Sequence, residues 1–186
     1  FHGTKFLIGG VVLKTTQLVE IAILVAMAFV LEVAFSFLPA MPQGGRVSLS
    51  LLPIIVIAWR NGPYAGIVGG IVYGLLNLML NGALYHWGSF FLDYTVAFGL
   101  VGLSGFVRKL GLNNVVGFGI AIFVGYFFRF FSHVLSGVLL FAEYAGDQNV
   151  WIYSISYNAT YLIPALILTV IVGVIVYFPL QTIKEA

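Results

Sequence analysis

Long apolar stretches that recur from one end of the chain to the other constrain its fold more than any other feature. Of the 186 residues, 61% are hydrophobic and only 8% are charged. A soluble globular protein carries roughly 25% charged residues, and a helix needs about 20 apolar residues to cross the core of a lipid bilayer. The sequence therefore predicts an integral membrane protein that crosses the bilayer several times.

Proline, glycine and charged residues divide the apolar sequence into six segments. The expected fold is all-α, a bundle of six transmembrane helices in a single membrane domain over residues 1–186. Between the second and third segments, Asn61, Gly62 and Pro63 predict a tight turn, with proline at the first position of the next helix. The expected spans lie near residues 17–38, 47–60, 64–80, 89–107, 114–142 and 153–178.

The distribution of basic residues predicts the orientation of this bundle, because cytoplasmic flanks of membrane spans are enriched in Lys and Arg. On the opposite side, only Arg46 is basic, and the loops there are aromatic and mildly acidic. Both termini are therefore predicted to be cytoplasmic. The basic residues on the predicted cytoplasmic side are Lys5, Lys14, Arg60, Arg108, Lys109 and Lys184.

Several classes of chemistry find no support in the sequence. The chain has no cysteine, which excludes disulfides and thiolate chemistry, and its net charge of +2 is too small to indicate nucleic-acid binding. It contains no G-x-x-x-x-G-K-[ST] loop for ATP and no H-E-x-x-H zinc motif. We therefore expect no catalytic residue, metal or cofactor in this chain.

Charged groups inside the spans are the main candidates for function, since each costs at least about 2.5–3.5 kcal/mol to insert. Asp93 is the strongest ligand candidate, because a buried carboxylate without a partner needs a cation and Arg129 is expected to lie too deep to be that partner. We interpret Arg129 as structural, paired with a carboxylate or a helix C-terminus, and leave Glu32 undecided. The full set is Glu32, Asp93, Arg129 and His133, with Asn77 and Asn158 as uncharged companions.

These groups are expected to meet in the outer half of the bundle, near several aromatic side chains. Asp93 and Asn158 lie close to the outer ends of their spans, and Gly137 and Phe141 follow His133 on one helix face. A carboxylate beside aromatic walls suits a small, flat, cationic ligand. Two plainer interpretations stay open: His133 is a hydrogen-bonded intramembrane histidine, and aromatics such as Tyr144 and Trp151 form an interfacial belt.

Four separated motifs resemble one family in order and spacing, over roughly residues 17–178. They are GGRVSLSLLPIIVIAWRNGPYAGIVGGIVYG, FLDYTVAFGLVGLSG, RFFSHVLSGVLLFAEYA and YSISYNA. They are similar to the thiamin-specific substrate-binding subunits (S components, ThiT type) of energy-coupling factor (ECF) transporters. The resemblance implies a bacterial cell-membrane protein that binds thiamin. Its partners would be a transmembrane coupling protein (T component) and two ATPase subunits.

The family pattern also implies functional residues. Ala22 and Ala26 correspond to a docking face for the coupling protein on the first helix. Asp93 replaces a glutamate of the family, Phe141 falls where the family has a tryptophan, and the tryptophan that covers the ligand has no counterpart in LPAMPQGGRVS. Either Trp87 or no residue takes that role, while Tyr85 and Trp87 are further candidates for ligand binding. Pro39–Gly45 is the expected moving cover. The implied ligand-binding residues are Asp93, Tyr94, His133, Gly137, Phe141, Tyr153 and Asn158.

Three alternatives to thiamin binding follow from the same residues. The first is an S component for another vitamin or precursor, although a carboxylated ligand should find a basic residue at the outer site. The second is an intramembrane enzyme that uses Asp93 and His133 as acid and base. The third is a passive channel or structural bundle, which predicts no saturable binding.

Overall fold

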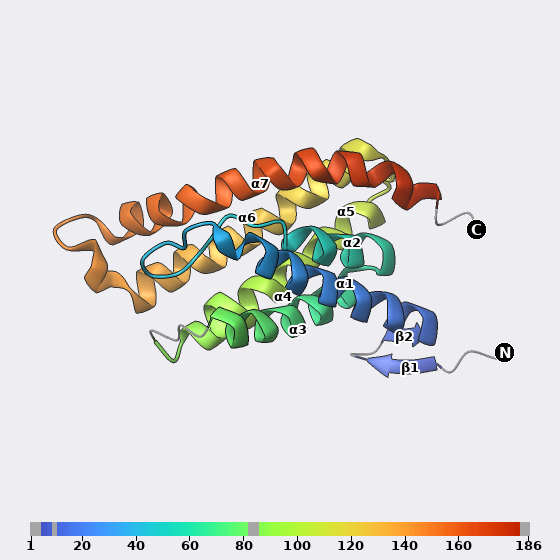
Figure 1. Cartoon of the computed structure of the whole chain (residues 1–186), viewed down its shortest axis with the longest axis horizontal. Helices are drawn as coiled ribbons and strands as arrows, with labels where there is room; N and C mark the ends of the chain where they lie inside the picture. Colours follow the sequence, from blue (N-terminus) through green and yellow to red (C-terminus); the bar gives the residue numbers. More distant parts are fainter. Residues whose placement is uncertain (1–4, 9–10, 82–85, 183–186) are drawn as a thin grey trace.

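A computed structural model describes residues 5–8, 11–81 and 86–182 (Figure 1). The described chain opens with an antiparallel hairpin, in which Lys5 pairs with Lys14, and continues into a bundle that is all-α, as predicted. The elements in order are β1 (Lys5–Ile8), β2 (Val11–Lys14), α1 (Thr15–Ala34), η1 (Phe35–Phe37), α2 (Leu51–Asn61), α3 (Pro63–Asn81), η2 (Phe90–Val96), α4 (Ala97–Val101), η3 (Gly102–Ser104), α5 (Gly105–Lys109), α6 (Val115–Leu140), η4 (Ala142–Ala145) and α7 (Val150–Thr182).

Five helical segments in the described residues are long and apolar enough to cross a membrane, and a sixth, α2, is shorter. The second span, expected near residues 47–60, begins only at Leu51. Its 11 residues rise about 16 Å, roughly half of a bilayer core of about 30 Å. Every residue from Leu51 to Trp59 is buried, so α2 forms the centre of the bundle. The five longer segments are Thr15–Phe37, Pro63–Leu80, Phe90–Lys109, Val115–Leu140 and Val150–Gln181.

A non-helical segment, residues 38–50, precedes α2 and includes the start of the expected second span; we call it the cover loop. Irregular backbone inside a membrane is tolerated where it is buried in protein or lines a cavity. Here Ser48 Oγ donates to Glu32 Oε2 of α1 at 2.8 Å and shares a 2.7 Å hydrogen bond with Ser50 Oγ. Glu32, undecided from the sequence, therefore anchors the cover loop to α1.

A row of glycines lets α3 pack directly on the fourth span. A Cβ at Gly70 would collide with the carbonyl oxygen of Phe98, and a Cβ at Gly74 with that of Tyr94. Close packing of this kind is the use of small-residue stripes in membrane helices. The α3 backbone thus supports the segment that carries Asp93 and Tyr94.

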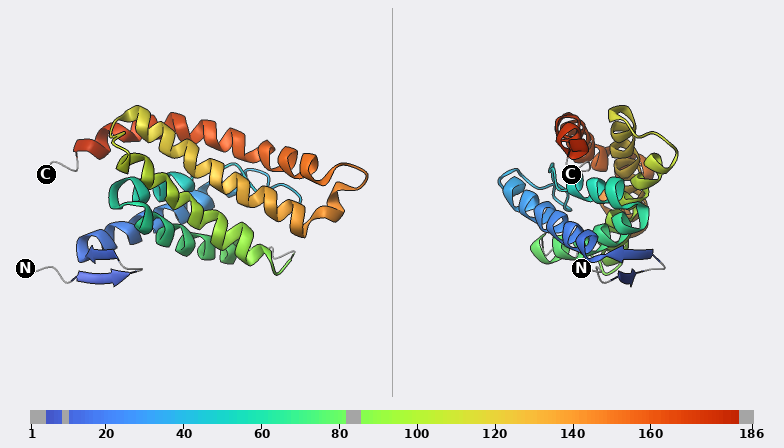
Figure 2. Two further views of the ribbon diagram at one scale, coloured as in Figure 1. Left: turned by 180° about the vertical axis from the view of Figure 1, so that it is seen from behind. Right: turned by 90° about the vertical axis from the view of Figure 1, so that its right-hand side faces the viewer.

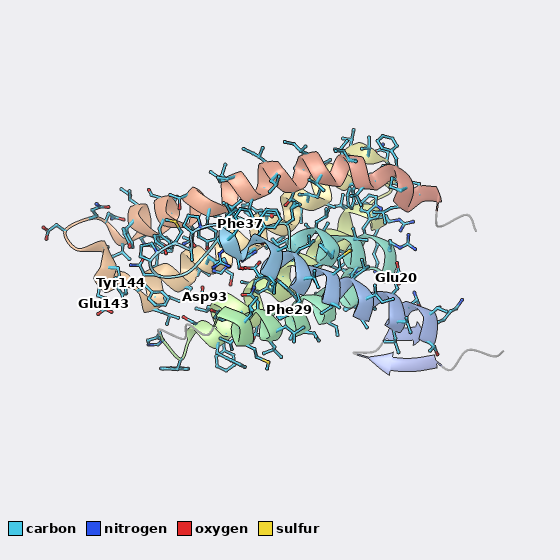
Figure 3. The ribbon with its side chains drawn as sticks, in the orientation of Figure 1. Glu20, Phe29, Phe37, Asp93, Glu143 and Tyr144 are labelled. Carbon is cyan, nitrogen blue, oxygen red and sulfur yellow. The ribbon has the colours of Figure 1, made fainter. Side chains whose placement is uncertain are left out.

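The bundle has two chemically different ends. At one end α1 begins and α7 ends (Figure 1), and Arg60 binds Glu20 and the carbonyl of Leu180. Arg108 lies at this end too, where it donates to the Trp59 carbonyl at 2.8 Å. Figure 3 places Glu20 toward this end and Asp93 and Tyr144 toward the other. The start of α1 and the end of α7 therefore lie at the same end of the bundle. The assignment of this end to the cytoplasm stays a prediction.

Helices α6 and α7 lie side by side in every view of the ribbon (Figures 1 and 2). Their far ends are joined by η4 and the turn that follows it. With the cover loop and the start of η2, they surround the cavity that is described next.

Candidate ligand-binding site

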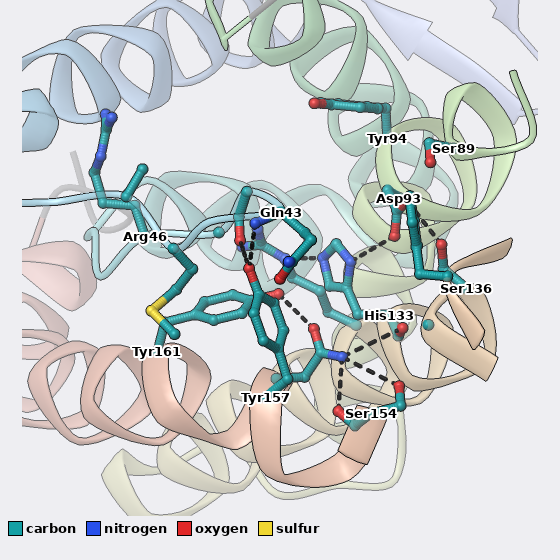
Figure 4. Close-up of a pocket in the computed structure, with 18 of the residues that line it drawn as sticks. Gln43, Arg46, Ser89, Asp93, Tyr94, His133, Ser136, Ser154, Tyr157 and Tyr161 are labelled. Carbon is teal, nitrogen blue, oxygen red and sulfur yellow. Dashed lines mark hydrogen bonds and ion pairs between the residues drawn. The ribbon is translucent and has the colours of Figure 1, made fainter. Parts of the chain in front are cut away.

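A cavity of about 260 Å³ opens among η2, α6, α7 and the cover loop, at the end of the bundle away from Arg60 and Arg108 (Figure 4). Ligand sites commonly measure about 300–1,000 Å³, so this cavity has the scale of a small molecule. All seven ligand-binding residues expected from the family pattern line it: Asp93, Tyr94, His133, Gly137, Phe141, Tyr153 and Asn158.

A π-helical turn presents Asp93 and Tyr94 to the cavity. The turn, η2, replaces the first part of the fourth span, and Thr95 Oγ1 donates to the Phe90 carbonyl at 2.8 Å within it. Single π-turns inside helices occur frequently at functional sites. The Asp93 side chain remains 19% exposed, so a ligand can reach its carboxylate.

Asp93 belongs to a chain of hydrogen bonds that crosses the site. Arg129 Nε donates to His133 Nε2 at 3.1 Å, and His133 Nδ1 lies 2.9 Å from Asp93 Oδ1. Because arginine can only donate, Nε2 is the acceptor and Nδ1 carries the proton that is donated to Asp93. Ser136 Oγ donates to the other carboxylate oxygen at 2.7 Å. Neutral His133 therefore bridges an arginine and a carboxylate.

These hydrogen bonds correct the expectations for Asp93 and Arg129. Asp93 is not an unpaired carboxylate, because both of its oxygens accept hydrogen bonds from α6. A carboxylate retains further lone pairs, so it can still accept from a ligand. Arg129 is coupled to Asp93 through His133, and its guanidinium lies 4.3 Å from the centre of the Phe98 ring. In the described residues no carboxylate lies within 4.0 Å of Arg129; the aromatic face supplies its stabilising contact instead.

Asn158 and Gly137 hold α7 against α6. The Asn158 amide donates to the His133 carbonyl of α6 at 3.4 Å. Within α7 it also donates to the Ser154 carbonyl at 2.9 Å and accepts from Tyr161 at 2.7 Å, and Asn158 is only 5% exposed. A Cβ at Gly137 would collide with Ser154 Oγ. Gly137 is therefore required for close packing of α6 on α7, and it also lines the cavity.

Aromatic side chains and the cover loop form the outer wall. Tyr157 Oη accepts from the backbone N–H of Gln43 at 2.8 Å and donates to the Gly44 carbonyl at 2.9 Å, so α7 holds the loop. Tyr153 stands 6.0 Å from the Tyr157 ring, and Phe141 ends α6. Figure 4 shows Gln43 and Tyr157 facing His133 across the site.

The inner part of the cavity is a second polar cluster. Glu32 accepts from Tyr73 at 3.2 Å as well as from Ser48, and Asn77 donates to Tyr73 at 3.1 Å. Glu32 and Asn77 both line the cavity, and each is 6% exposed. Glutamate, tyrosine and asparagine thus supply one another's partners at depth.

Both signs of charge border the cavity. Arg46 and Arg129 line it together with Asp93 and Glu32, so a count of charges does not select a ligand. The positions of the charged groups are more informative than their number. Arg129 is engaged with His133 and Phe98, and Figure 4 shows Arg46 on the far side of the site from Asp93. His133 thus lies between the two charges, with Arg129 at one ring nitrogen and the Asp93 carboxylate at the other.

The outer loop contains two further candidates for ligand binding, Trp87 and Tyr85. Trp87 is 75% exposed, packs near His86 and does not line the cavity, so it does not cover a ligand in this conformation. The short turn before Ser89 directs the indole outward, while the cover loop occupies the space above the cavity. Tyr85 lies outside the described residues. On α1, Ala22 and Ala26 are exposed on the outside of the bundle.

Comparison with known proteins identifies the family. The family model described as "Thiamine transporter protein" matches residues 18–184, nearly the whole chain. The chain belongs to the thiamine transporter protein family. Within that family it is 39% identical over 171 residues to "Thiamine transporter ThiT" of Bacillus subtilis (strain 168), an alignment that covers 86% of this chain and 88% of the relative. The Lacticaseibacillus paracasei protein of the same name is 32% identical over 171 residues, with 83% of each chain covered.

Solved structures confirm the fold of this thiamine transporter family member. The structure reported as ThiT from Listeria monocytogenes superposes with a TM-score of 0.74 at 24% identity, covering 91% of this chain and 96% of the other. The S component of a bacterial ECF transporter gives a TM-score of 0.61 at 20% identity, covering 92% and 98%. The chain is therefore a multi-pass membrane protein with the S-component fold.

Sequence reasoning missed some residues of the site. Ser136 and Tyr157 are not among the residues expected from the sequence, and Gln43 is expected only as part of the cover Pro39–Gly45. Ser136 could have been found from its spacing, since it follows His133 by three residues on one helix face. No sequence pattern predicts the contact of Gln43 with Tyr157, because only the path of the cover loop brings the two residues together.

Proposed function

We propose that this protein is the thiamin-binding S component of an ECF importer and that it captures thiamin from the outer face of the membrane. The observation that carries the proposal is the 2.9 Å contact of Asp93 with His133 inside an aromatic-walled cavity. Thiamin joins a cationic thiazolium to a flat aminopyrimidine, and it therefore needs a counter-charge and stacking faces. Two relatives that carry the name thiamine transporter support the same ligand.

The thiazolium is placed beside Asp93 and His133. Neutral His133 offers its ring without adding a positive charge, and the Asp93 carboxylate compensates the charge of the ligand. Ser136 and His133 already hold both carboxylate oxygens, so the group needs little rearrangement when the ligand arrives. Such preorganisation lowers the cost of binding.

The aminopyrimidine is placed against the outer wall. Phe141 supplies a stacking face, while Tyr94 and Tyr153 supply hydroxyl groups that line the cavity. Asn158 lies behind them, where its amide is already used between α6 and α7. Phenylalanine keeps the stacking surface that a tryptophan would give but has no indole donor.

Energy for uptake comes from partner subunits in this proposal, because the chain has no ATP-binding loop. Its basic end faces the cytoplasm, where a T component and two ATPase subunits would assemble with it. Ala22 and Ala26 are exposed on α1 and leave room for a partner helix to approach closely. Membership of a transporter family also makes an enzymatic role for Asp93 and His133 unnecessary.

Titration with thiamin tests the proposal. Detergent-purified protein contains three tryptophans, and quenching of their fluorescence should saturate at low thiamin concentration, with calorimetry as a second readout. Asp93→Asn keeps the shape but removes the charge, and should weaken binding by at least about tenfold, since losing a charged contact costs about 1.5–3 kcal/mol.

Other ligands separate the alternatives. Saturation by a carboxylated vitamin but not by thiamin would reassign the site to an anion held by Arg46 or Arg129. Recovery of altered thiamin from the isolated protein would support an enzyme, whereas unchanged thiamin supports a carrier. The absence of any saturable response would favour a channel or structural bundle.

A further inference from the structure

Ser89 belongs to the wall of the cavity, and the proposed ligand contacts leave its hydroxyl unexplained. Ser89 stands immediately before η2, lines the cavity and is only 3% exposed. Within the described part of the chain, its Oγ has no hydrogen-bond partner. Figure 4 shows this side chain beside Asp93 and Ser136.

The serines on the facing helices behave differently. Ser132 donates to the Leu92 carbonyl at 2.6 Å, Ser136 to Asp93 at 2.7 Å and Ser154 to the Val134 carbonyl at 2.9 Å. A serine at the start of a helix commonly caps a free backbone amide, but the Ser89 side chain makes no such bond. Ser89 therefore performs none of the structural roles usual for a buried serine.

Buried hydroxyls without partners are rare in native proteins, because giving up water without gaining a hydrogen bond weakens the fold. Where such a group borders a cavity, a ligand in that cavity can satisfy it. Ser89 faces the same space as Asp93, one turn earlier in the chain. The carboxylate can only accept, whereas the serine hydroxyl can also donate.

We infer that the Ser89 hydroxyl donates a hydrogen bond to the bound vitamin and is a further specificity-determining residue. The inference rests on the proposed function. The atom it meets is a neutral acceptor, next to the cationic part of the ligand that Asp93 holds. In thiamin, the acceptors of this kind are the side-chain hydroxyl oxygen and the pyrimidine nitrogens.

The test compares Ser89→Ala with a matched control, Ser104→Ala. Ser104 is also fully buried and without a hydrogen-bond partner among the described residues, but it does not line the cavity. Calorimetry should show that Ser89→Ala binds thiamin about tenfold more weakly than the unmodified protein. The affinity of Ser104→Ala for thiamin should be unchanged. Neither variant should lower the melting temperature of the ligand-free protein, because neither loses a hydrogen bond.

Analogues identify the acceptor atom. Thiamin analogues that lack either the side-chain hydroxyl or one pyrimidine nitrogen are titrated into unmodified protein and Ser89→Ala. The difference between the two proteins should disappear with the analogue that lacks the acceptor. A difference that persists with every analogue would overturn the inference.

The remaining outcomes separate this inference from the proposed function. Equal affinities of Ser89→Ala and unmodified protein, with Asp93→Asn still weakened, would overturn the role of Ser89 alone. Weaker binding that accompanies a lower ligand-free melting temperature would make Ser89 a structural residue. Absence of thiamin binding by unmodified protein would overturn both proposals.

Discussion

At the residue scale, the site depends on which atoms donate and which accept. Arg129 can only donate, so His133 is oriented with its protonated nitrogen toward Asp93. The carboxylate is then held from two directions, because Ser136 donates to its other oxygen. This arrangement uses the neutral form of His133, and its charge state therefore matters for binding.

The first prediction is that thiamin binding weakens as the pH falls from about 8 to about 5, the range in which histidines commonly titrate. A second proton on His133 would face Arg129 Nε, which also donates, and would add positive charge beside a cationic ligand. Isothermal titration across this range should show a dissociation constant several-fold higher at pH 5.

Two variants make the pH test specific. His133→Gln should bind more weakly but with a flatter pH profile, whereas His86→Gln, whose ring lies near exposed Trp87, should keep the profile of the unmodified protein. A flat profile in the unmodified protein would contradict the role given to His133.

At the element scale, the approach of α7 to α6 and the hold of α7 on the cover loop shape the cavity. Gly137 permits the close approach of α7 to α6, and Tyr157 holds the cover loop on α7. Neither contact follows from the pattern of a single helix. Both bring together segments that are far apart in the sequence.

Replacing Gly137 by alanine should destabilise the protein by about 1–3 kcal/mol, because the new methyl group collides with Ser154. Gly119→Ala is the control on the same helix, since nothing lies within 4 Å of its position, and it should be neutral or stabilising by up to about 1 kcal/mol. Thermal unfolding in detergent measures both. Equal melting temperatures for the two variants would show that α6 and α7 do not need close contact here.

Tyr157→Phe should release thiamin faster, by about tenfold, because the cover loop loses two hydrogen bonds to α7. Stopped-flow fluorescence measures the dissociation rate. Tyr64→Phe is the comparison, since Tyr64 is exposed on α3 and does not line the cavity, and this variant should leave the release rate unchanged. An unchanged release rate in Tyr157→Phe would mean that the loop does not limit release.

At the scale of the whole molecule, the cavity and the proposed docking face on α1 are separated. The cavity lies at one end of the bundle, while Ala22 and Ala26 lie outside it on α1, where Ile23 and Val30 are also more than half exposed. A surface that does not border the cavity can change without altering binding. Docking and binding should therefore respond to different substitutions.

Ala22→Leu combined with Ala26→Leu should abolish thiamin uptake by cells that also make the partner subunits, because the larger side chains prevent close helix approach. Thiamin affinity of the purified variant should stay unchanged. Val116→Leu, which enlarges an exposed residue on α6, should affect neither. Normal uptake by the double variant would exclude this face of α1 from docking.

The sequence by itself determined the membrane class, the helical character of the bundle and the family, since these follow from apolar length and from motif order. It also indicated the residues of the cavity wall, because Asp93, His133 and Asn158 are polar where polarity is costly. The tertiary structure alone decided their partners. Sequence spacing cannot show that Arg129 reaches Asp93 through His133, that Gly137 faces Ser154, or that Ser89 has no partner, because hydrogen bonds between helices depend on how those helices are packed.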